Sequence, residues 1–125
     1  MSRIKPTPSE LEILKILWEK GSSSVRDVHN ILSKDKDVFY TTTLKTMQVM
    51  FAKDLLSRDT STRSHIYASA VEQKEIEKSL IDSLVNSVFS GSTTQLIMSA
   101  LGNKRVKPGE LEQIKSLLEK MEDDE

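Results

Sequence analysis

One helical face between residues 40 and 53 combines hydroxyl, amide and ammonium groups without a carboxylate. At the helical period this face carries Thr42, Lys45, Thr46, Val49 and Lys53, with Thr41 and Gln48 on its borders. A solvated face usually mixes both signs of charge, whereas donors and ammoniums without acid suit the phosphates and base edges of a DNA major groove. The same composition also fits a Thr-rich helix without a ligand, so the neighbouring elements must decide between these interpretations.

The opposite side of this segment is apolar and predicts how the helix is held. An inward stripe is formed by Tyr40, Leu44, Met47 and Phe51, with Thr43 and Met50 beside them. Asp54 is expected to end the helix in the left-handed backbone conformation, where glycine would be best. We therefore expect a helix that packs on a core and leaves its polar face free.

Two helices are predicted to precede this segment. Pro8 and Glu10 are typical of a helix start, and Gly21 is a plausible end of the helix. Ser24 is expected to cap a second helix, with Asp27 as its capping-box partner. That helix is predicted to run from residue 25 to about residue 32.

Two extended segments follow the polar helix. Residues 55–58 and 65–68 read as strands, and the turn-rich segment 59–64 joins them. Arg58 and Arg63 lie on this hairpin. Three helices and a basic hairpin follow the order of a winged helix-turn-helix, in which the third helix enters the major groove and the hairpin touches phosphate or the minor groove. Taken alone, the hairpin slightly favours an ordinary solvated one, and the three helices before it are what favour DNA binding.

The second half of the chain is predicted to form three more helices. The first covers residues 71–89 and is closed by Gly91, the second covers residues 93–101 and is ended by Gly102 and Asn103, and the third starts at Pro108. Together they offer more apolar side chains than a helical hairpin can bury. A second copy of the chain is the simplest partner for this surplus, and a two-fold dimer would present two reading helices to two half-sites. In the alternative, these helices pack back on the first domain within a monomer.

Composition limits the function classes. The 125 residues are 37% hydrophobic and 30% charged, with a net charge of −1, which fits one domain or a small domain with an appendage. Residues 1–67 hold 11 Lys and Arg against 8 Asp and Glu, whereas residues 68–125 hold 7 against 11. The absence of cysteine excludes disulfides, thiolate metal sites and a cysteine nucleophile. No apolar run approaches a membrane span and the start lacks a signal-peptide core, so the expected location is cytoplasmic.

Catalysis is not expected. His29 and His65 fall in separate elements, and no catalytic triad, paired carboxylates or glycine-rich phosphate loop stands out, so we expect no enzyme, cofactor or metal site. A protein-protein interaction adaptor is the main alternative, because winged helices also bind proteins. An exposed apolar patch around Val49, Phe51 and Ala52 would favour the adaptor, whereas the threonines and the ammonium group favour DNA.

Several segments, in order and spacing, resemble one known family. They are Pro8-Ser9-Glu10-Leu11-Glu12-Ile13-Leu14 with Leu17-Trp18, Val25-Arg26-Asp27-Val28-His29, Tyr40-Thr41-Thr42-Thr43-Leu44-Lys45-Thr46-Met47-Gln48, Arg63-Ser64-His65-Ile66-Tyr67 and Val88-Phe89-Ser90-Gly91-Ser92. They resemble the penicillinase-repressor (BlaI/MecI-type) transcriptional regulators over most of the chain. The resemblance implies a mainly α fold with a small β-hairpin. It places a winged-helix DNA-binding domain at 1–70 and a helical dimerisation domain at 71–125.

The resemblance also implies a function. Members are homodimeric repressors that bind a dyad-symmetric operator of double-stranded DNA, silence antibiotic-resistance genes, and are relieved by a membrane sensor-protease that leads to their cleavage. The DNA contacts expected here are Thr41, Thr42, Lys45, Thr46, Gln48, Arg58 and Arg63. Three positions depart from the family pattern: Val49 stands where an arginine is frequent, Asp54 replaces a common glycine, and Ser99-Ala100 replaces the Asn-Phe bond that is cleaved in well-studied members. The lack of cysteine argues against the copper-responsive branch.

Overall fold

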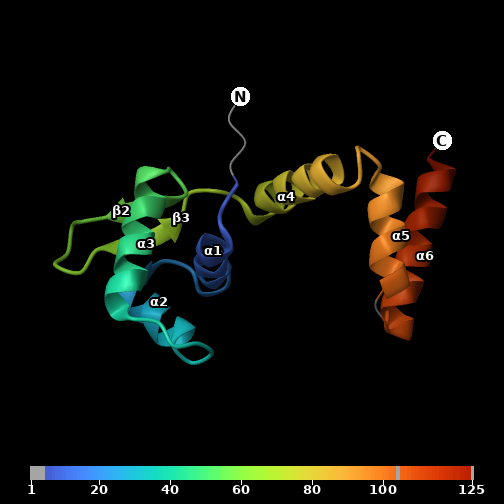
Figure 1. Ribbon diagram of the computed structural model, residues 1–125. Helices are drawn as coiled ribbons and strands as arrows, with labels where there is room; N and C mark the ends of the chain where they lie inside the picture. Colours follow the sequence, from blue (N-terminus) through green and yellow to red (C-terminus); the bar gives the residue numbers. More distant parts are fainter. Residues whose placement is uncertain (1–4, 104, 125) are drawn as a thin grey trace. The chain divides into compact units, whose positions relative to one another are not determined.

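The computed structural model describes residues 5–103 and 105–124 (Figure 1). Within them the elements are α1 (Pro8–Lys20), β1 (Ser23–Ser24), α2 (Val25–Leu32), α3 (Tyr40–Ala52), β2 (Leu56–Asp59), β3 (Ile66–Ser69), α4 (Gln73–Val88), α5 (Thr93–Asn103) and α6 (Pro108–Asp123). This confirms the expected mainly helical fold with a small sheet. The chain divides into two compact units, residues 1–81 and 82–125. The division lies within α4, and the expected boundary at 70/71 between two functional domains stays a prediction. None of the described helices is both long and apolar enough to span a membrane.

The first two helices begin and end at the residues that the sequence indicates. Thr7 caps α1, and its side chain accepts a hydrogen bond from the backbone N–H of Glu10. The Glu10 carboxylate in turn accepts one from the backbone N–H of Thr7, which completes a capping box. The same reciprocal pair joins Ser24 and Asp27 at the start of α2. Gly21 follows α1 with a φ of 84°. Asp54 has a φ of 65°, which confirms the left-handed end predicted after α3.

The sheet of the first unit has three antiparallel strands in the order β1-β3-β2. β2 and β3 form the predicted hairpin, with Arg58 opposite Tyr67. The loop that joins them projects from the rest of this unit (Figure 1). β1 pairs Ser24 with Ile66 on the other edge of β3. The sequence did not predict β1, because two serines before a helix cap show no alternation and no apolar side chain.

The core of the first unit lies between the three helices and the sheet. Leu14 from α1, Val28 from α2 and Met47 and Met50 from α3 are fully buried, and Tyr67 from β3 is 1% exposed. The apolar stripe predicted for α3 therefore faces this core, with Tyr40, Leu44 and Phe51 packed at its margins. The outer side of α3 is left at the surface.

The tryptophan of α1 anchors the chain just after the wing, which is the hairpin formed by β2 and β3 with the loop between them. The indole N–H of Trp18 lies 2.9 Å from Ser69 Oγ and 3.1 Å from the carbonyl oxygen of Val71. The Ser69 hydroxyl also donates to that carbonyl, at 2.6 Å. These bonds fix the segment that leads from β3 towards α4, so Trp18 has a structural role.

The second unit contains the end of α4 together with α5 and α6. Ser90 and Gly91 turn the chain after α4, with φ values of 49° and 84°. α5 extends through Gly102 and Asn103, so the prediction that these residues end it at residue 101 was wrong. A glycine in the last turn of a helix costs little helix stability, because no later helical turn depends on the backbone of that turn.

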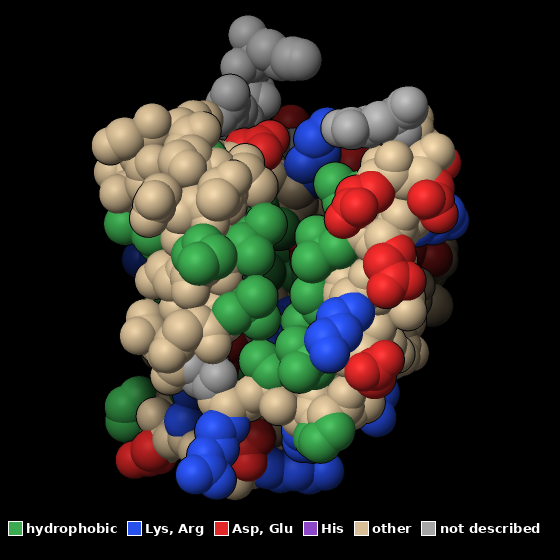
Figure 2. Space-filling view, turned by 90° about the vertical axis from the view of Figure 1, so that its right-hand side faces the viewer, with side chains coloured by type: hydrophobic (Ala, Val, Ile, Leu, Met, Phe, Trp, Pro, Cys, Tyr) green, Lys and Arg blue, Asp and Glu red, His purple; other side chains and the backbone are tan. Residues whose placement is uncertain are grey.

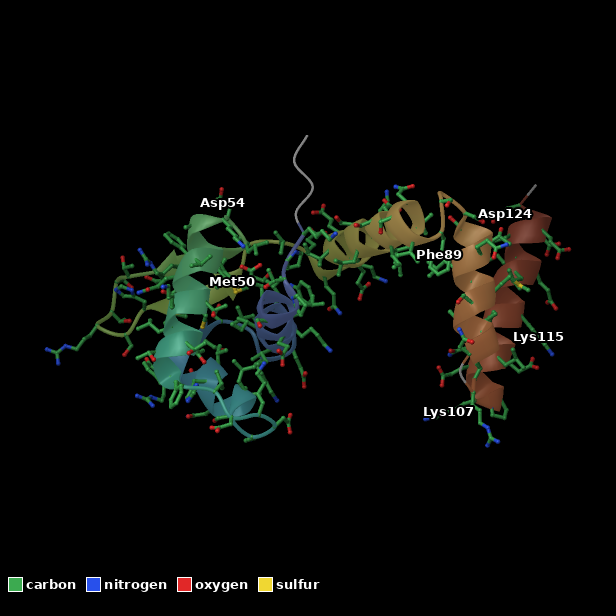
Figure 3. The ribbon with its side chains drawn as sticks, in the orientation of Figure 1. Met50, Asp54, Phe89, Lys107, Lys115 and Asp124 are labelled. Atoms are coloured by element: carbon green, nitrogen blue, oxygen red, sulfur yellow. The ribbon has the colours of Figure 1, made fainter. Side chains whose placement is uncertain are left out.

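None of the described residues of α5 and α6 is buried in the single chain. Met98 is 64% exposed, and Leu117, Leu118 and Met121 are each at least half exposed. Hydrophobic side chains gather in a band over these two helices (Figure 2). Lys115 points away from α5 (Figure 3), so α6 has an apolar side and a charged side.

Candidate nucleic-acid interface

The outer side of α3 forms an exposed surface without acid. We define the reading face as Thr41, Thr42, Lys45, Gln48 and Val49, which are all exposed. The helix is held from behind by its buried side chains, so this face is presented by a fixed backbone. Its groups can donate to phosphate and base edges, and Gln48 can both donate and accept.

Thr46 is less available than the other predicted contacts on α3. It is half-buried, and its hydroxyl donates to the carbonyl oxygen of Thr42 at 2.8 Å. A hydroxyl that bonds back to its own helix no longer offers its proton to a ligand, although its lone pairs can still accept. Thr46 therefore borders the reading face rather than forming part of it.

Lys53 forms an ion pair within the fold. Its Nζ lies 2.8 Å from Glu10 Oε2, and the side chain of Glu10 is only 5% exposed. Burial raises the pKa of Glu10, but the hydrogen bonds from Lys53 and from the Thr7 backbone outweigh it and leave the pKa below its ordinary value. The pair ties the end of α3 to the start of α1. The sequence pattern placed Lys53 with the outer residues because helical spacing carries no information about a partner in another helix.

The two hairpin arginines have different environments. Arg63 is exposed in the loop between β2 and β3. Arg58 is half-buried, with its guanidinium carbon 4.1 Å from the centroid of the Phe51 ring. Its Nε is buried and has no hydrogen-bond partner among the described residues. Arg63 is therefore free to meet a ligand, whereas Arg58 packs the wing against the end of α3.

A groove runs along each side of α3. The wing-side groove is lined by Ser24, Val25, Arg26, Tyr40, Leu44, Gln48, Arg63, Ser64, His65 and Tyr67. The α1-side groove is lined by Thr7, Ser9, Glu10, Thr41, Thr42, Lys45, Thr46 and Val49. The first holds two guanidiniums and an imidazole and no carboxylate, whereas the carboxylate of the second is already paired with Lys53. This arrangement, a ridge between two grooves, suits a helix seated in a major groove with a DNA strand on either side.

Sequence reasoning missed a cluster that joins α2 to α3. The guanidinium carbon of Arg26 lies 4.2 Å from the centroid of the Tyr40 ring. The His29 ring meets Tyr40 edge-on, and its Nδ1 lies 3.0 Å from Thr43 Oγ1. His29 therefore has a structural role in the contact between α2 and α3. The sequence offered no direct signal for this cluster, because Arg26 and Tyr40 lie in different helices and meet only in the folded chain.

The surface does not favour the adaptor interpretation. Phe51 is half-buried beneath Arg58, so it forms no open apolar patch with Val49 and Ala52. Val49 is 40% exposed and stands among polar residues of the reading face. Phe39, which precedes α3, is 79% exposed and was not predicted. Single exposed apolar side chains are common on protein surfaces and do not by themselves indicate a protein partner.

Comparison with known proteins gives a family. The family model described as "Penicillinase repressor" matches residues 6–120. A penicillinase repressor from Staphylococcus aureus is 20% identical over 93% of this chain and 92% of its own length. The transcriptional regulator BlaI of Mycobacterium tuberculosis is 28% identical over 90% of this chain and 82% of its own length. The methicillin resistance regulatory protein MecI of Staphylococcus aureus is 21% identical over 90% of this chain and 91% of its own length.

Solved structures are similar as well, and one of them is that of Bordetella bronchiseptica BpsR, described in work on the mechanism by which 6-hydroxynicotinic acid regulates its DNA binding. It covers 95% of this chain and 76% of that one, with a TM-score of 0.47 and 23% identity. The assignment rests instead on the family model, which spans most of the chain. The chain belongs to the penicillinase repressor family, which consists of DNA-binding transcriptional repressors and not of enzymes.

Proposed function

We propose that this protein is a homodimeric repressor that reads a dyad-symmetric DNA operator with α3 and the wing. The observation that carries the proposal is the reading face, which is exposed, free of carboxylates and backed by a closed core. Membership of a repressor family supplies the class of function. The finer statements concern the contacts, the dimer and the regulated genes.

The proposed contacts divide into readout and positioning. Thr41, Thr42, Lys45 and Gln48 meet bases and nearby phosphates, and a glutamine that bonds adenine through two atoms discriminates between bases. Arg63 holds backbone phosphate from the tip of the wing and so sets the register. Thr46 and Arg58 support this surface from within, because one bonds to its own helix and the other packs on Phe51.

The proposed dimer uses the second unit. The apolar band over α5 and α6 would be covered by the same band of another copy, as an isologous two-fold interface requires. Two copies of α3 would then address two half-sites of one operator. This assigns dimerisation to the segment after residue 70, as the sequence predicts.

The biological setting follows the relatives. Their names refer to penicillinase and methicillin resistance, so we propose that the target genes act in antibiotic resistance and that repression takes place in the cytoplasm. A membrane sensor-protease is the proposed route of relief. Ser99 and Ala100 lie inside α5, so cleavage between them would first require this helix to unwind locally.

The test is selection of duplexes from a random DNA pool by the full-length protein at moderate salt, followed by sequencing. A dyad-symmetric motif is the expected result. Weak, salt-sensitive retention without a motif would contradict the proposal and favour the adaptor. On the selected site, Gln48→Ala should change sequence preference by about 1–3 kcal/mol, whereas Arg63→Ala should weaken specific and random DNA alike. Equal effects of both substitutions on both DNAs would contradict the division of contacts.

A further inference from the structure

Arg26 is held in place by aromatic rings from two helices. Its guanidinium carbon lies 4.2 Å from the Tyr40 ring centroid, and the His29 ring packs edge-on against Tyr40 at 5.4 Å and 82°. His29 Nδ1 lies 3.0 Å from Thr43 Oγ1, and Thr43 is 1% exposed. This arrangement connects an exposed cation to the core. A guanidinium stacked on a ring keeps its peripheral N–H groups free to donate and loses little freedom when it binds.

Among the described residues, no acid forms an ion pair with Arg26 or with Arg63. The carboxylate of the adjacent Asp27 accepts the backbone N–H of Ser24 at 3.1 Å, as a helix cap. Both arginines are exposed, so each can still take an anionic partner.

The two guanidiniums line the same groove from opposite elements. Arg26 comes from α2, Arg63 comes from the wing, and Gln48 of α3 lines the same groove. His65 adds a further donor, and the lining contains no carboxylate. When α3 occupies a major groove, the strand at its edge must pass along such a flank. Phosphodiester oxygens are the acceptors that a guanidinium fork matches.

Arg58 has the opposite character. Its guanidinium stacks on Phe51, its Nε is buried without a partner, and the residue is half-buried. The side chain supports the junction of wing and α3, and Arg58 does not line the wing-side groove. The position of Arg58 on the hairpin predicts a phosphate contact, but its packing on Phe51 leaves its guanidinium less free to make one than that of the exposed Arg26.

We propose that Arg26 binds the DNA backbone together with Arg63, as a two-guanidinium clamp across the wing-side groove, and that Tyr40 and His29 position it. This inference rests on the proposed DNA-binding function and adds to it a phosphate contact outside α3 and the wing. Arg26 contributes affinity and register without base preference. Arg58 contributes to folding and not to the phosphate contact.

The test measures the affinity of the full-length protein for its selected duplex and for a random duplex over a range of salt concentrations. Arg26→Ala should weaken both by about tenfold and lower the slope of log affinity against log salt by about one per protomer. Arg26→Lys should keep most of the slope but bind more weakly, because an ammonium lacks the planar fork. Arg58→Ala should lower the melting temperature and leave the slope unchanged.

Two controls separate contact from fold. Lys15→Ala removes an exposed cation of α1 that lies in neither groove and should change neither affinity nor slope. Tyr40→Phe keeps the ring and should bind like the wild type, whereas Tyr40→Leu should reproduce part of the loss of Arg26→Ala. Circular dichroism melting of each variant verifies that it is folded.

The outcomes are distinct. An unchanged salt slope in Arg26→Ala, or a reduced one in Arg58→Ala, overturns the clamp while the proposed repressor function stands. A wild type that retains no duplex at all would overturn the proposed function and the inference with it.

Discussion

The three-helix core before residue 70 and the helical pair α5–α6 use apolar residues in opposite ways. In the first, Leu14, Val28 and Met47 are completely buried within one chain. In the second, Met98 and Leu117 remain more than half exposed although their helices are regular. The difference shows that regular helices do not guarantee a closed core. The first region buries its apolar side chains within one chain, whereas the second leaves them exposed, and the proposed dimer would cover them.

The largest effect is expected from a charge on the apolar side of α6. Leu118→Glu should convert a dimer into monomers, because a buried carboxylate at the interface has no partner. Losing the second half-site should lower operator affinity by about 10²–10⁴-fold. Sedimentation and DNA titration measure the two effects. Ser116→Glu introduces the same charge on the polar side of the helix and is the matched control. Dimers formed equally well by both variants would contradict the proposed interface.

A cavity in the core of the first unit should lower the stability of each chain by itself. Leu14→Ala should lower the free energy of unfolding by about 2–5 kcal/mol, because it removes a fully buried side chain. The loss should not depend on protein concentration. Met98→Ala in α5 should instead alter the melting temperature in a concentration-dependent way. Denaturation at several protein concentrations distinguishes them, and the same concentration dependence in both would remove the contrast between the regions.

The ion pair between Glu10 and Lys53 should make the stability of the first unit depend on pH. The native pKa of Glu10 is lowered, so its contribution to stability is complete above the ordinary pKa of about 4.5 and is lost as the pH falls through the native value. Glu10→Gln should cost about 1–3 kcal/mol at neutral pH and flatten this acid dependence. Unfolding curves for both proteins across this acid range test it, with exposed Glu19→Gln as control. Parallel curves would argue against the pair.

The smallest effect is expected where α3 ends. Asp54 has a φ of 65° (its position is marked in Figure 3), a conformation that glycine adopts without the steric cost of a Cβ atom. Asp54→Gly should therefore stabilise the first unit by about 0.5–1 kcal/mol, and Asp54→Val should destabilise it by more. Thermal melting measures both. Stabilisation by valine would be incompatible with the left-handed conformation.

Apart from β1, the order of helices and strands could be predicted because each signal was local. The caps Ser24 and Asp27, the left-handed Asp54 and the apolar stripe of α3 all depend on neighbours within a few residues. Gly102 misled the prediction because glycine marks a helix end only as a tendency, and α5 continues through it.

The candidate site was only partly predictable, since its details depend on contacts between distant segments. Helical spacing identified the exposed Thr41, Lys45 and Gln48. It could not reveal that Lys53 is paired with Glu10, because the partner lies 43 residues away. The packing of Arg58 on Phe51 and of Arg26 on Tyr40 likewise depends on how separate elements meet. Helical spacing thus identifies the exposed face of α3, whereas tertiary packing determines which cations lie beside that face.

The anchored indole of Trp18 also makes the protein its own optical reporter. The sequence contains one tryptophan, and its N–H is bonded to Ser69 and Val71, where β3 gives way to the segment before α4. Intrinsic tryptophan emission, excited selectively over the two tyrosines, therefore comes from a single fluorophore at that junction. A shift in its wavelength on adding operator DNA would report a rearrangement there, without any attached dye.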